Sequence, residues 1–378
     1  MSQQTNKSVL LVANTGWYLY RFRIPLAKKL QAQGFNPIFI CPADEHSAQL
    51  QKMGFKWLEW NIGRRSLNPL AELLAIFKLY HIYKAQQPAI IHHFTIKPVI
   101  YGSIAAKLAR LTHVINSITS RGYVYLNRSL KARFIRMLTS TAYRCLLNSG
   151  YTVFENPIDQ SFFVSSRFSN PRKSITIYGN GVDTEKFKPL PEPTGEIIVL
   201  FASRFLKDKG ILTFIDAARQ LQNEPLCQFV LVGAPDLGNL SSVSEAEVNS
   251  WVKAGIVQWW GWDNDIRNSF AKSHIFVLPS LGEGIANILM EASACERAII
   301  TSTAQGCKDI IEHEINGLLI PPQNTASLVS AIRRLITDPP LRERLRKEAR
   351  QKVFGRFDTE TVNTQTIELY RKILQETP

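Results

Sequence analysis

The sequence has 378 residues, of which 45% are hydrophobic and 20% charged. This composition is typical of a globular protein, and the length suits two domains. No apolar run reaches the roughly 18–20 residues of a membrane-spanning helix, and the stretch at 9–13 is too short for a signal peptide. The five scattered cysteines include no C-x-x-C pair, so neither a disulfide framework nor a cysteine zinc site is expected. We therefore expect a cytoplasmic protein.

The charge is unevenly distributed along the chain. Residues 1–200 hold 25 Lys and Arg against 10 Asp and Glu, a net charge of +15, whereas the remainder has a net charge of −1. Between Glu72 and Glu155 there is no acidic residue but there are eleven basic ones. Because a field of one sign attracts ligands of the other, the first half is expected to meet an anionic partner, either a membrane lipid, a diphosphate or a nucleic acid.

Short apolar segments alternate with longer amphipathic ones. In the first half, strands are expected at 9–13, 37–41, 55–60, 89–92 and 113–118, with helices at 24–33, 68–85 and 98–111. After residue 190, strands are expected at 197–202, 228–232, 256–260, 275–279 and 298–301, and the chain ends in three helical segments between 325 and 374. Alternation of this kind predicts parallel sheets covered by helices on both faces.

A proline-rich segment separates the two halves. Residues 188–195 contain three prolines and a glycine, which disfavour any regular element and predict a linker. We therefore predict an α/β protein with two doubly wound, Rossmann-like domains at 1–188 and 189–355, and a C-terminal helix at 356–378 that can pack back on the first domain. Such domains would face each other across a cleft, and open α/β sheets bind ligands at the carboxyl ends of their strands.

Two cations follow the first strand of the second half. Arg204 and Lys209 come directly after the strand expected at 197–202, next to a helix that begins near Gly210. This setting suits a diphosphate, because cations balance its charge and backbone amides at a helix start donate to its oxygens. By itself, the segment is equally compatible with an exposed basic loop.

Two glutamates stand eight residues apart after a later strand. Glu283 is expected in the loop that follows Leu278-Pro279-Ser280, and Glu291 about two turns into the next helix. Eight helical positions return to within about 80° of the same face, about 12 Å further along. Two carboxylates placed in this way can bind two sets of hydroxyls, such as those of a sugar and a ribose. The alternative is an ordinary solvated helix face.

These motifs together resemble the retaining glycosyltransferase family 4, which has the two-domain GT-B fold. Arg204 and Lys209 are followed by Glu283 and Glu291 within Leu-Pro-Ser-x-x-Glu-Gly. Further matches lie at 179–183, 306–309 and 316–319. The segment 93–98, with Tyr101 and Gly102, resembles a subgroup that builds bacterial surface polysaccharides, such as O-antigen and capsule, and protein-linked glycans. The resemblance covers residues 8–375.

The resemblance implies a role for each motif residue. Arg204 and Lys209 would bind the donor diphosphate and stabilise it as it leaves, so the catalytic set would be Glu283, Arg204 and Lys209. Glu283 would hold the hydroxyls of the donor sugar, and Glu291 those of the ribose.

Four further positions complete the implied donor site. Gly16 would let backbone amides approach the phosphates, and Gly284 would allow close approach of the backbone to the ligand. Gly261 and Trp262 would line the nucleobase pocket. The resemblance also implies retention of anomeric configuration, no metal or other cofactor, a nucleotide-sugar donor that is most often a UDP-sugar, and a polyprenyl-diphosphate-linked acceptor at the inner face of the cytoplasmic membrane.

The chain departs from the family pattern at several positions. Ala286 stands where many relatives have Pro, Glu296 where they have Gly, and residues 120–122 where the subgroup often has Gly-Leu-Gly. A second family histidine falls at Phe94, and the adjacent pair His92-His93 leaves open which histidine, if either, contacts a substrate.

Asp263 and Asp265 have the D-x-D spacing that holds Mn²⁺ or Mg²⁺ in a different glycosyltransferase fold. Here the pair precedes an expected helix. We therefore interpret both aspartates as N-capping residues rather than metal ligands.

The segment 130–147 is expected to form a basic amphipathic helix without acidic residues. Such a helix can lie on an anionic membrane, although its apolar stripe also suits ordinary core packing. The candidate acceptor- and membrane-binding residues are Lys97, Arg121, Lys131, Arg133 and Arg136.

Two other classes of function stay open from the sequence. One is a different sugar-nucleotide-processing enzyme on this fold, such as an epimerase or a phosphorylase, since a fold does not fix a function. The other is a basic protein that binds a membrane or nucleic acid without catalysis. No nucleic-acid-binding motif is recognisable, so a nucleic-acid partner is not expected.

Overall fold

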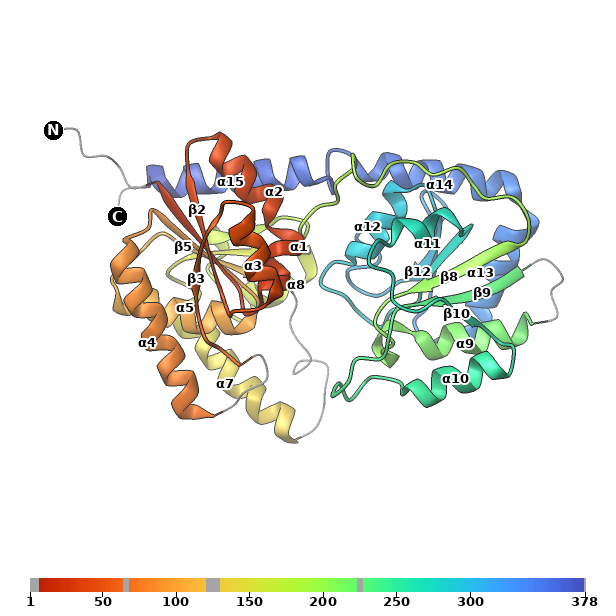
Figure 1. The fold of residues 1–378 in the computed structure, drawn as a ribbon, viewed down its shortest axis with the longest axis horizontal. Coiled ribbons are helices and arrows are strands. Elements are labelled where there is room, and N and C mark those ends of the chain that lie inside the picture. Colours follow the sequence, from red (N-terminus) through yellow and green to blue (C-terminus); the bar gives the residue numbers. More distant parts are fainter. Residues whose placement is uncertain (1–6, 64–67, 120–129, 223–226, 377–378) are drawn as a thin grey trace. The chain divides into compact units, whose positions relative to one another are not determined.

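The computed structural model describes residues 7–63, 68–119, 130–222 and 227–376. The chain divides into two compact units (Figure 1). Unit 1 comprises residues 1–180 and 362–378, and unit 2 comprises residues 181–361. No helix among the described residues is long and apolar enough to cross a membrane.

The described part of unit 1 is built on a parallel seven-stranded sheet in the order β3-β2-β1-β4-β5-β6-β7. Its strands are β1 (Ser8–Val12), β2 (Asn36–Cys41), β3 (Lys56–Glu59), β4 (Ile90–Phe94), β5 (Val114–Ile118), β6 (Tyr151–Phe154) and β7 (Ser174–Thr176). Its helices are α1 (Gly16–Phe22), α2 (Ile24–Ala32), α3 (Glu45–Lys52), α4 (Pro69–Gln86), α5 (Ile96–Leu108), α7 (Leu130–Leu146), α8 (Pro157–Ser165), the short 3-10 turn η1 (Pro171–Lys173) and most of α15 (Thr359–Gln375).

The central strands of unit 1 are apolar on both faces. All five residues of β1 are buried, as are those of β4 and β5, because helices cover both sides of the sheet. The strand order reverses between β1 and β4, which pair through Leu10 and Ile91. Ligands of doubly wound sheets bind at such a reversal, beyond the carboxyl ends of the strands.

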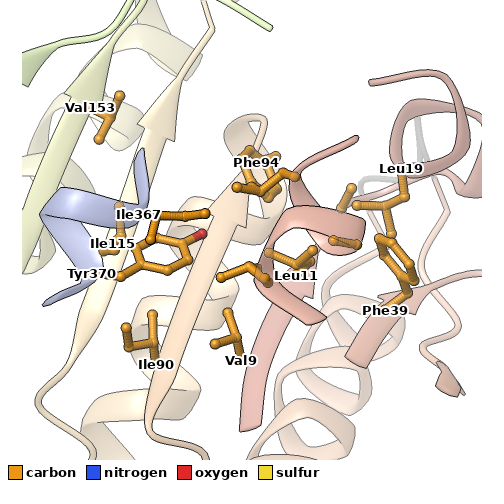
Figure 2. Close-up of a cluster of buried hydrophobic side chains, with 14 of the residues drawn as sticks. Val9, Leu11, Leu19, Phe39, Ile90, Phe94, Ile115, Val153, Ile367 and Tyr370 are labelled. Atoms are coloured by element: carbon orange, nitrogen blue, oxygen red, sulfur yellow. The ribbon is translucent and has the colours of Figure 1, made fainter. Parts of the chain in front are cut away.

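The C-terminal helix α15 is part of the core of unit 1. Ile367 and Tyr370 belong to the same buried cluster as Leu11, Ile90 and Ile115 (Figure 2). The Tyr370 hydroxyl also lies 2.6 Å from a ring nitrogen of the His92 side chain. The last helix of the chain therefore completes the first unit.

The described part of unit 2 is built on a parallel six-stranded sheet in the order β10-β9-β8-β11-β12-β13. Its strands are β8 (Ile197–Ala202), β9 (Cys227–Val232), β10 (Gln258–Trp259), β11 (Ile275–Leu278), β12 (Ala298–Ser302) and β13 (Leu318–Ile320). Its helices are the 3-10 turn η2 (Lys207–Lys209), α9 (Ile211–Gln220), α10 (Glu245–Lys253), α11 (Arg267–Ala271), α12 (Asn287–Ala294), α13 (Thr325–Thr337) and α14 (Pro339–Val353). The two parallel sheets match the α/β class expected from the sequence.

The expected linker at 188–195 is fixed to unit 2. The backbone amide of Leu190 donates to Cys295 O, and Glu192 forms an ion pair with Arg342 at 2.7 Å. The division between the units instead falls after Asn180 and again after Thr361. Proline removes regular hydrogen bonding, but side-chain contacts can still hold an irregular segment in place.

Candidate active site

The order of strands also reverses in unit 2, between β8 and β11. These neighbours pair in parallel, with Ile275 opposite Val199, so their carboxyl ends meet at one edge of the sheet. Arg204 and Lys209 follow β8, and Glu283 follows β11. The topology thus brings three of the expected donor residues to the reversal point, where α/β sheets bind their ligands.

Lys209 and Glu283 form a close ion pair. The Lys209 Nζ donates to both carboxylate oxygens of Glu283, at 2.6 Å and 2.5 Å. The Ser280 hydroxyl donates to Glu283 Oε1 at 2.8 Å and is also 3.1 Å from Asp208 O. Both charged side chains are largely shielded from solvent, so the pair is fixed in position rather than mobile at the surface.

Two glycines allow the surrounding loops to touch. Gly210 has a φ of +79°, and a Cβ placed there would lie 2.1 Å from Pro279 O. A Cβ at Gly306 would lie 2.6 Å from Glu283 O, next to the hydrogen bond between Glu283 N and Gln305 O at 2.9 Å. Only glycine fits at these two contacts, which position the loops that carry Lys209 and Glu283.

Arg204 has a partner that the sequence did not reveal. Its Nη1 donates to Asp236 Oδ2 at 2.7 Å. The backbone fixes this contact, because Phe205 N donates to Ala234 O and Lys207 N donates to Ser241 O. Asp236 follows β9, the neighbour of β8, so the rule that ligand-binding side chains follow neighbouring strands could have identified it.

Glu291 and Gly284 lie on either side of the start of α12. The helix begins only at Asn287, so Glu291 is one turn into it rather than two, and Glu283 does not belong to the helix. The argument that eight helical positions return to one face therefore does not apply to this pair. Ala286 is the N-cap residue of α12 and has a non-helical conformation.

Gly261 and Trp262 lie beyond the carboxyl end of β10. Gly261 O accepts a hydrogen bond from Gly233 N at 2.8 Å, which ties this loop to the one after β9. Trp262 is 63% exposed, and its ring donates to Asn264 Oδ1. A hollow of about 450 Å³ lies beside it, and its lining includes Trp260.

Asp263 and Asp265 bond to protein groups. Asp263 Oδ1 accepts from Asp265 N and its Oδ2 from the Ser269 hydroxyl, and Asp265 binds the Arg267 side chain. The N-cap residue of α11 is Ile266, so the expected N-cap role of the two aspartates is wrong. Each aspartate instead accepts a hydrogen bond from the backbone amide two residues later, in the turns that precede the helix. Among the described residues, no group of three or more His, Cys, Asp or Glu side chains is placed to hold a metal ion.

Glu296, the residue that replaces the family glycine, adopts a left-handed conformation with a φ of +55°. Its carboxylate forms an ion pair with Arg346 at 3.0 Å. The backbone conformation explains why glycine suits this position, and the ion pair contributes a contact that glycine cannot make.

Gly16 lies in unit 1, at the start of α1. Its amide donates to Asp44 Oδ2 at 2.8 Å. The amide that was expected to approach phosphate oxygens is therefore bonded to a carboxylate of the chain itself. Asp44 caps α3, and nothing in the local sequence around Gly16 indicated this contact.

His92 and His93 are both buried on β4, and each has partners at both ring nitrogens. His92 bonds to the hydroxyls of Tyr370 and Ser117, at 2.6 Å and 2.7 Å. His93 bonds to Asn116 at 2.8 Å and to Tyr83 at 2.9 Å. Burial lowers the pKa of His92 well below its usual value and that of His93 to about 4. Both imidazoles therefore hold elements of unit 1 together.

A buried polar group lies beside these histidines. Arg23 donates to the Tyr18 hydroxyl at 2.6 Å, and its guanidinium is 4.0 Å from the centre of the Phe94 ring. Burial raises the pKa of Glu155 to about 8, although Arg23 lowers it and Asp159 raises it further. Glu155 directly follows β6. Its position in the sequence did not indicate that its carboxyl would be buried, because charged residues after strands are usually exposed.

The residues expected to bind the acceptor or the membrane differ in their exposure and in their hydrogen-bond partners. Lys97 donates to Gly63 O and to Glu72, each at 2.8 Å, so it fastens α5 to α4. Arg133 is exposed on α7, whereas Arg136 is half-buried. Arg121 lies outside the described residues, and Lys131 falls within α7 but its side chain is not described. Of the three described side chains, Lys97 is therefore bonded between α5 and α4, whereas Arg133 and Arg136 belong to α7.

The groups around β8 and β11 are suited to bind a polyanion. A cation held by a carboxylate is oriented by it and keeps its remaining N–H groups for another acceptor. Lys209 and Arg204 are both held in this way, by Glu283 and Asp236. The arrangement therefore offers two oriented cations and one carboxylate fixed between loops.

Two family models match consecutive parts of the chain. "Glycosyl transferase 4-like" matches residues 8–150, and "Glycosyl transferases group 1" matches residues 182–352.

Curated relatives align over most of the chain. The N,N'-diacetylbacillosaminyl-diphospho-undecaprenol alpha-1,3-N-acetylgalactosaminyltransferase of Campylobacter jejuni is 28% identical, over 96% of this chain and 98% of its own. The UDP-Gal:alpha-D-GlcNAc-diphosphoundecaprenol alpha-1,3-galactosyltransferase of Escherichia coli is 26% identical, over 78% of each chain.

Solved structures share the fold. HepE of Anabaena in complex with UDP-glucose superposes with a TM-score of 0.80 and 20% identity, over 97% of this chain and 99% of its own. A glycosyltransferase of Rickettsia africae superposes with a TM-score of 0.79 and 20% identity, over 99% and 100% of the chains. With two parallel-sheet α/β units and both family models matched, this chain belongs to glycosyltransferase family 4 and is a glycosyltransferase of the GT-B fold.

Proposed function

We propose that the protein transfers a hexose or an N-acetylhexosamine from a UDP-sugar to a polyprenyl-diphosphate-linked glycan, with retention of anomeric configuration. The reaction would take place at the inner face of the cytoplasmic membrane, during synthesis of a cell-surface polysaccharide or glycan. The names of the Campylobacter and Escherichia relatives support the acceptor class, since both act on diphospho-undecaprenol-linked sugars. They also make galactose and N-acetylgalactosamine the first sugars to assay.

The observation that carries the proposal is the Lys209–Glu283 pair between the loops after β8 and β11. A nucleotide sugar carries its diphosphate on the anomeric carbon, so the sugar hydroxyls lie only a few bonds from the diphosphate. A cation and a carboxylate only 2.5 Å apart can therefore engage the diphosphate and the sugar at the same time. In this assignment Arg204 binds the other side of the diphosphate, and Glu291 contacts the ribose.

The proposed chemistry is departure of the diphosphate assisted by cations. The bond between the anomeric carbon and the β-phosphate oxygen breaks, and UDP keeps the bonding electrons. Lys209 and Arg204 stabilise the charge that develops on the leaving oxygens, which is the electrostatic contribution that preorganised donors make. The acceptor hydroxyl attacks from the face that UDP leaves and gives its proton to a diphosphate oxygen. No metal is required in this scheme.

Two measurements test the proposal. Calorimetric titration with UDP, GDP and ADP in the presence of EDTA should show preferential, metal-independent binding of UDP. Incubation with UDP-galactose or UDP-N-acetylgalactosamine and an undecaprenyl-diphosphate-linked sugar should then extend the acceptor by one residue. A protein that binds none of the three nucleotides, or that needs a divalent ion for UDP, would contradict the proposed donor site.

A matched pair of variants separates the site from its surroundings. Lys209→Ala removes the paired cation, whereas Lys207→Ala removes an exposed cation two residues earlier on the same turn. We expect UDP affinity and transfer to be lost in the first variant and retained in the second. Equal effects of the two substitutions would point to a general charge effect instead of a built site.

A further inference from the structure

The outer face of α4 carries an apolar stripe that no other described element covers. Leu70, Leu73, Leu74 and Phe77 follow the i, i+3, i+4, i+7 spacing of one helix face, and each is between 48% and 67% exposed. Leu79, nine positions after Leu70, lies about 180° round the helix and is fully buried. The helix is therefore apolar on both its inner and its outer side, and a stable helix of that kind is covered on both.

The helix α7 repeats this arrangement. Phe134, Met137 and Leu138 follow the i, i+3, i+4 spacing and are each between 53% and 59% exposed. Tyr143, nine positions after Phe134, points about 180° away and is buried. The core of unit 1 thus holds the inner face of α7, and the apolar stripe is a separate outward-facing feature.

The two stripes belong to one layer of unit 1. α4 packs against α5, and α5 packs against α7 (Figure 1). Both stripes occupy the first halves of their helices, and helices that connect parallel strands begin at the carboxyl edge of the sheet. The stripes therefore lie toward the edge at which unit 1 is expected to receive its acceptor.

The charges around the stripes are of one sign. The first turn of α4 contains Glu72, but its carboxylate is bonded to Lys97 at 2.8 Å and is largely shielded. From there to Glu155 the chain has no acidic residue. The described cations on or beside the turns that carry the stripes are Lys78, Arg133 and Arg136, of which Arg133 is exposed and the other two are half-buried.

We propose that the outer faces of α4 and α7 insert into the interfacial region of an anionic lipid bilayer, with Leu70, Leu73, Leu74 and Phe77 among the acyl chains. Apolar side chains flanked by cations are the composition that such an interface selects. A second copy of the chain is a poorer occupant, because it would bring two surfaces of net positive charge together. The inference rests on the proposed function for its biological setting, since a polyprenyl-linked acceptor is itself membrane-bound, but it is tested without any transfer reaction.

The experiment is flotation of the full chain with vesicles of phosphatidylcholine, alone or mixed with phosphatidylglycerol. The wild type should float with the mixed vesicles and much less with phosphatidylcholine alone. The triple variant Leu73→Ser, Leu74→Ser, Phe77→Ser should bind the mixed vesicles at least about tenfold more weakly, since three large apolar side chains no longer leave water.

The matched control is Met53→Ser with Leu108→Ser. These side chains are 42% and 54% exposed, and they lie at the C-terminal ends of α3 and α5, at the opposite edge of the same sheet. The control should float like the wild type. Circular dichroism with thermal denaturation checks that every variant is folded, and Glu283→Ala should lose transfer while still floating, so failure of the proposed function would be seen separately.

Three outcomes would overturn the inference. The first is unchanged flotation of the triple variant. The second is equal flotation of the wild type with neutral and anionic vesicles. The third is a wild-type dimer in solution that the triple variant converts to a monomer without any change in flotation, which would identify the stripes as an interface between copies.

Discussion

Lys209 Nζ lies 2.6 Å and 2.5 Å from the two carboxylate oxygens of Glu283, and the two residues come from loops after neighbouring strands. Both residues belong to unit 2, and the Ser280 hydroxyl, which donates to Glu283 Oε1 at 2.8 Å, helps to orient the pair. A preorganised group of this kind does not need to reorient during the reaction, which is why it stabilises a transition state effectively.

The first prediction concerns the energetic coupling within this pair. We expect Lys209→Ala and Glu283→Ala each to lower kcat/KM by about 10²–10³-fold, the usual loss when a positioned electrostatic group is removed. The double variant should be little worse than either single variant, because each residue orients the other. Steady-state kinetics with UDP-sugar and lipid-linked acceptor measure the three values. Losses that multiply in the double variant would show that the residues act independently.

The second prediction uses two glycines from the same region. Gly306→Ala would place a Cβ 2.6 Å from Glu283 O, so it must displace the loop that carries Glu283. Gly282→Ala meets nothing within 4 Å. We expect the first substitution to reduce transfer strongly and the second to leave it nearly unchanged, with UDP titration and initial rates as the measurements. Similar activity of the two variants would mean that the position of Glu283 tolerates movement.

The donor motifs could be predicted because each is continuous in sequence and follows an apolar strand. The rule that parallel strands end at one edge of a sheet places Arg204, Lys209 and Glu283 at that edge, whereas their roles toward a donor come from the family resemblance. Their partners were harder to predict. Asp236 and Asp44 are distant in sequence from the residues that they contact, and only the strand order places them together.

The α4 stripe was missed for a different reason. A helix with apolar residues on two opposite faces has no clear polar side, so periodicity shows where it lies but not which face is covered. The sequence pattern therefore indicated only the basic residues of α7, of which Arg136 is half-buried. The burial of Glu155 could not be predicted from the sequence either, because it results from tertiary packing around the end of β6.

The third prediction concerns the return of α15 to unit 1. Tyr370→Phe removes a buried hydroxyl that is 2.6 Å from the His92 ring and leaves that ring one partner short. We expect the free energy of unfolding of unit 1 to fall by about 1–3 kcal/mol, the cost of a buried polar group left without its hydrogen bond. Urea denaturation followed by circular dichroism measures the change.

The control for this variant is Tyr80→Phe, whose hydroxyl accepts an exposed hydrogen bond from Lys84 at 3.3 Å. Its effect should stay within about 0.5 kcal/mol, as for most surface substitutions. UDP affinity should be unchanged in both variants, because the proposed donor residues lie in unit 2. A Tyr370→Phe protein as stable as the wild type would show that the His92 contact contributes no net stability.

The last prediction is a dependence of stability on pH that originates at Glu155. Burial raises the pKa of this carboxyl from 4.5 to about 8 in the folded protein, so the folded state holds a proton that the unfolded state releases above its own, lower pKa. The contribution of Glu155 to stability is therefore fully present below the unfolded pKa, and it is lost as the pH rises toward about 8.

The contribution of His93 to stability has the opposite dependence on pH. Burial lowers the pKa of His93 from 6.5 to about 4, so its contribution is lost as the pH falls through that range. We expect Glu155 to make Tm of the wild type decline as the pH rises from about 4.5 to about 8, and Glu155→Gln to remove that decline while leaving the loss that His93 causes below pH 6.5. Thermal denaturation from about pH 4 to about pH 9 tests this, with the exposed Glu59→Gln as the control that should follow the wild type. A decline over this pH range that persists in Glu155→Gln would mean that a group other than Glu155 causes it.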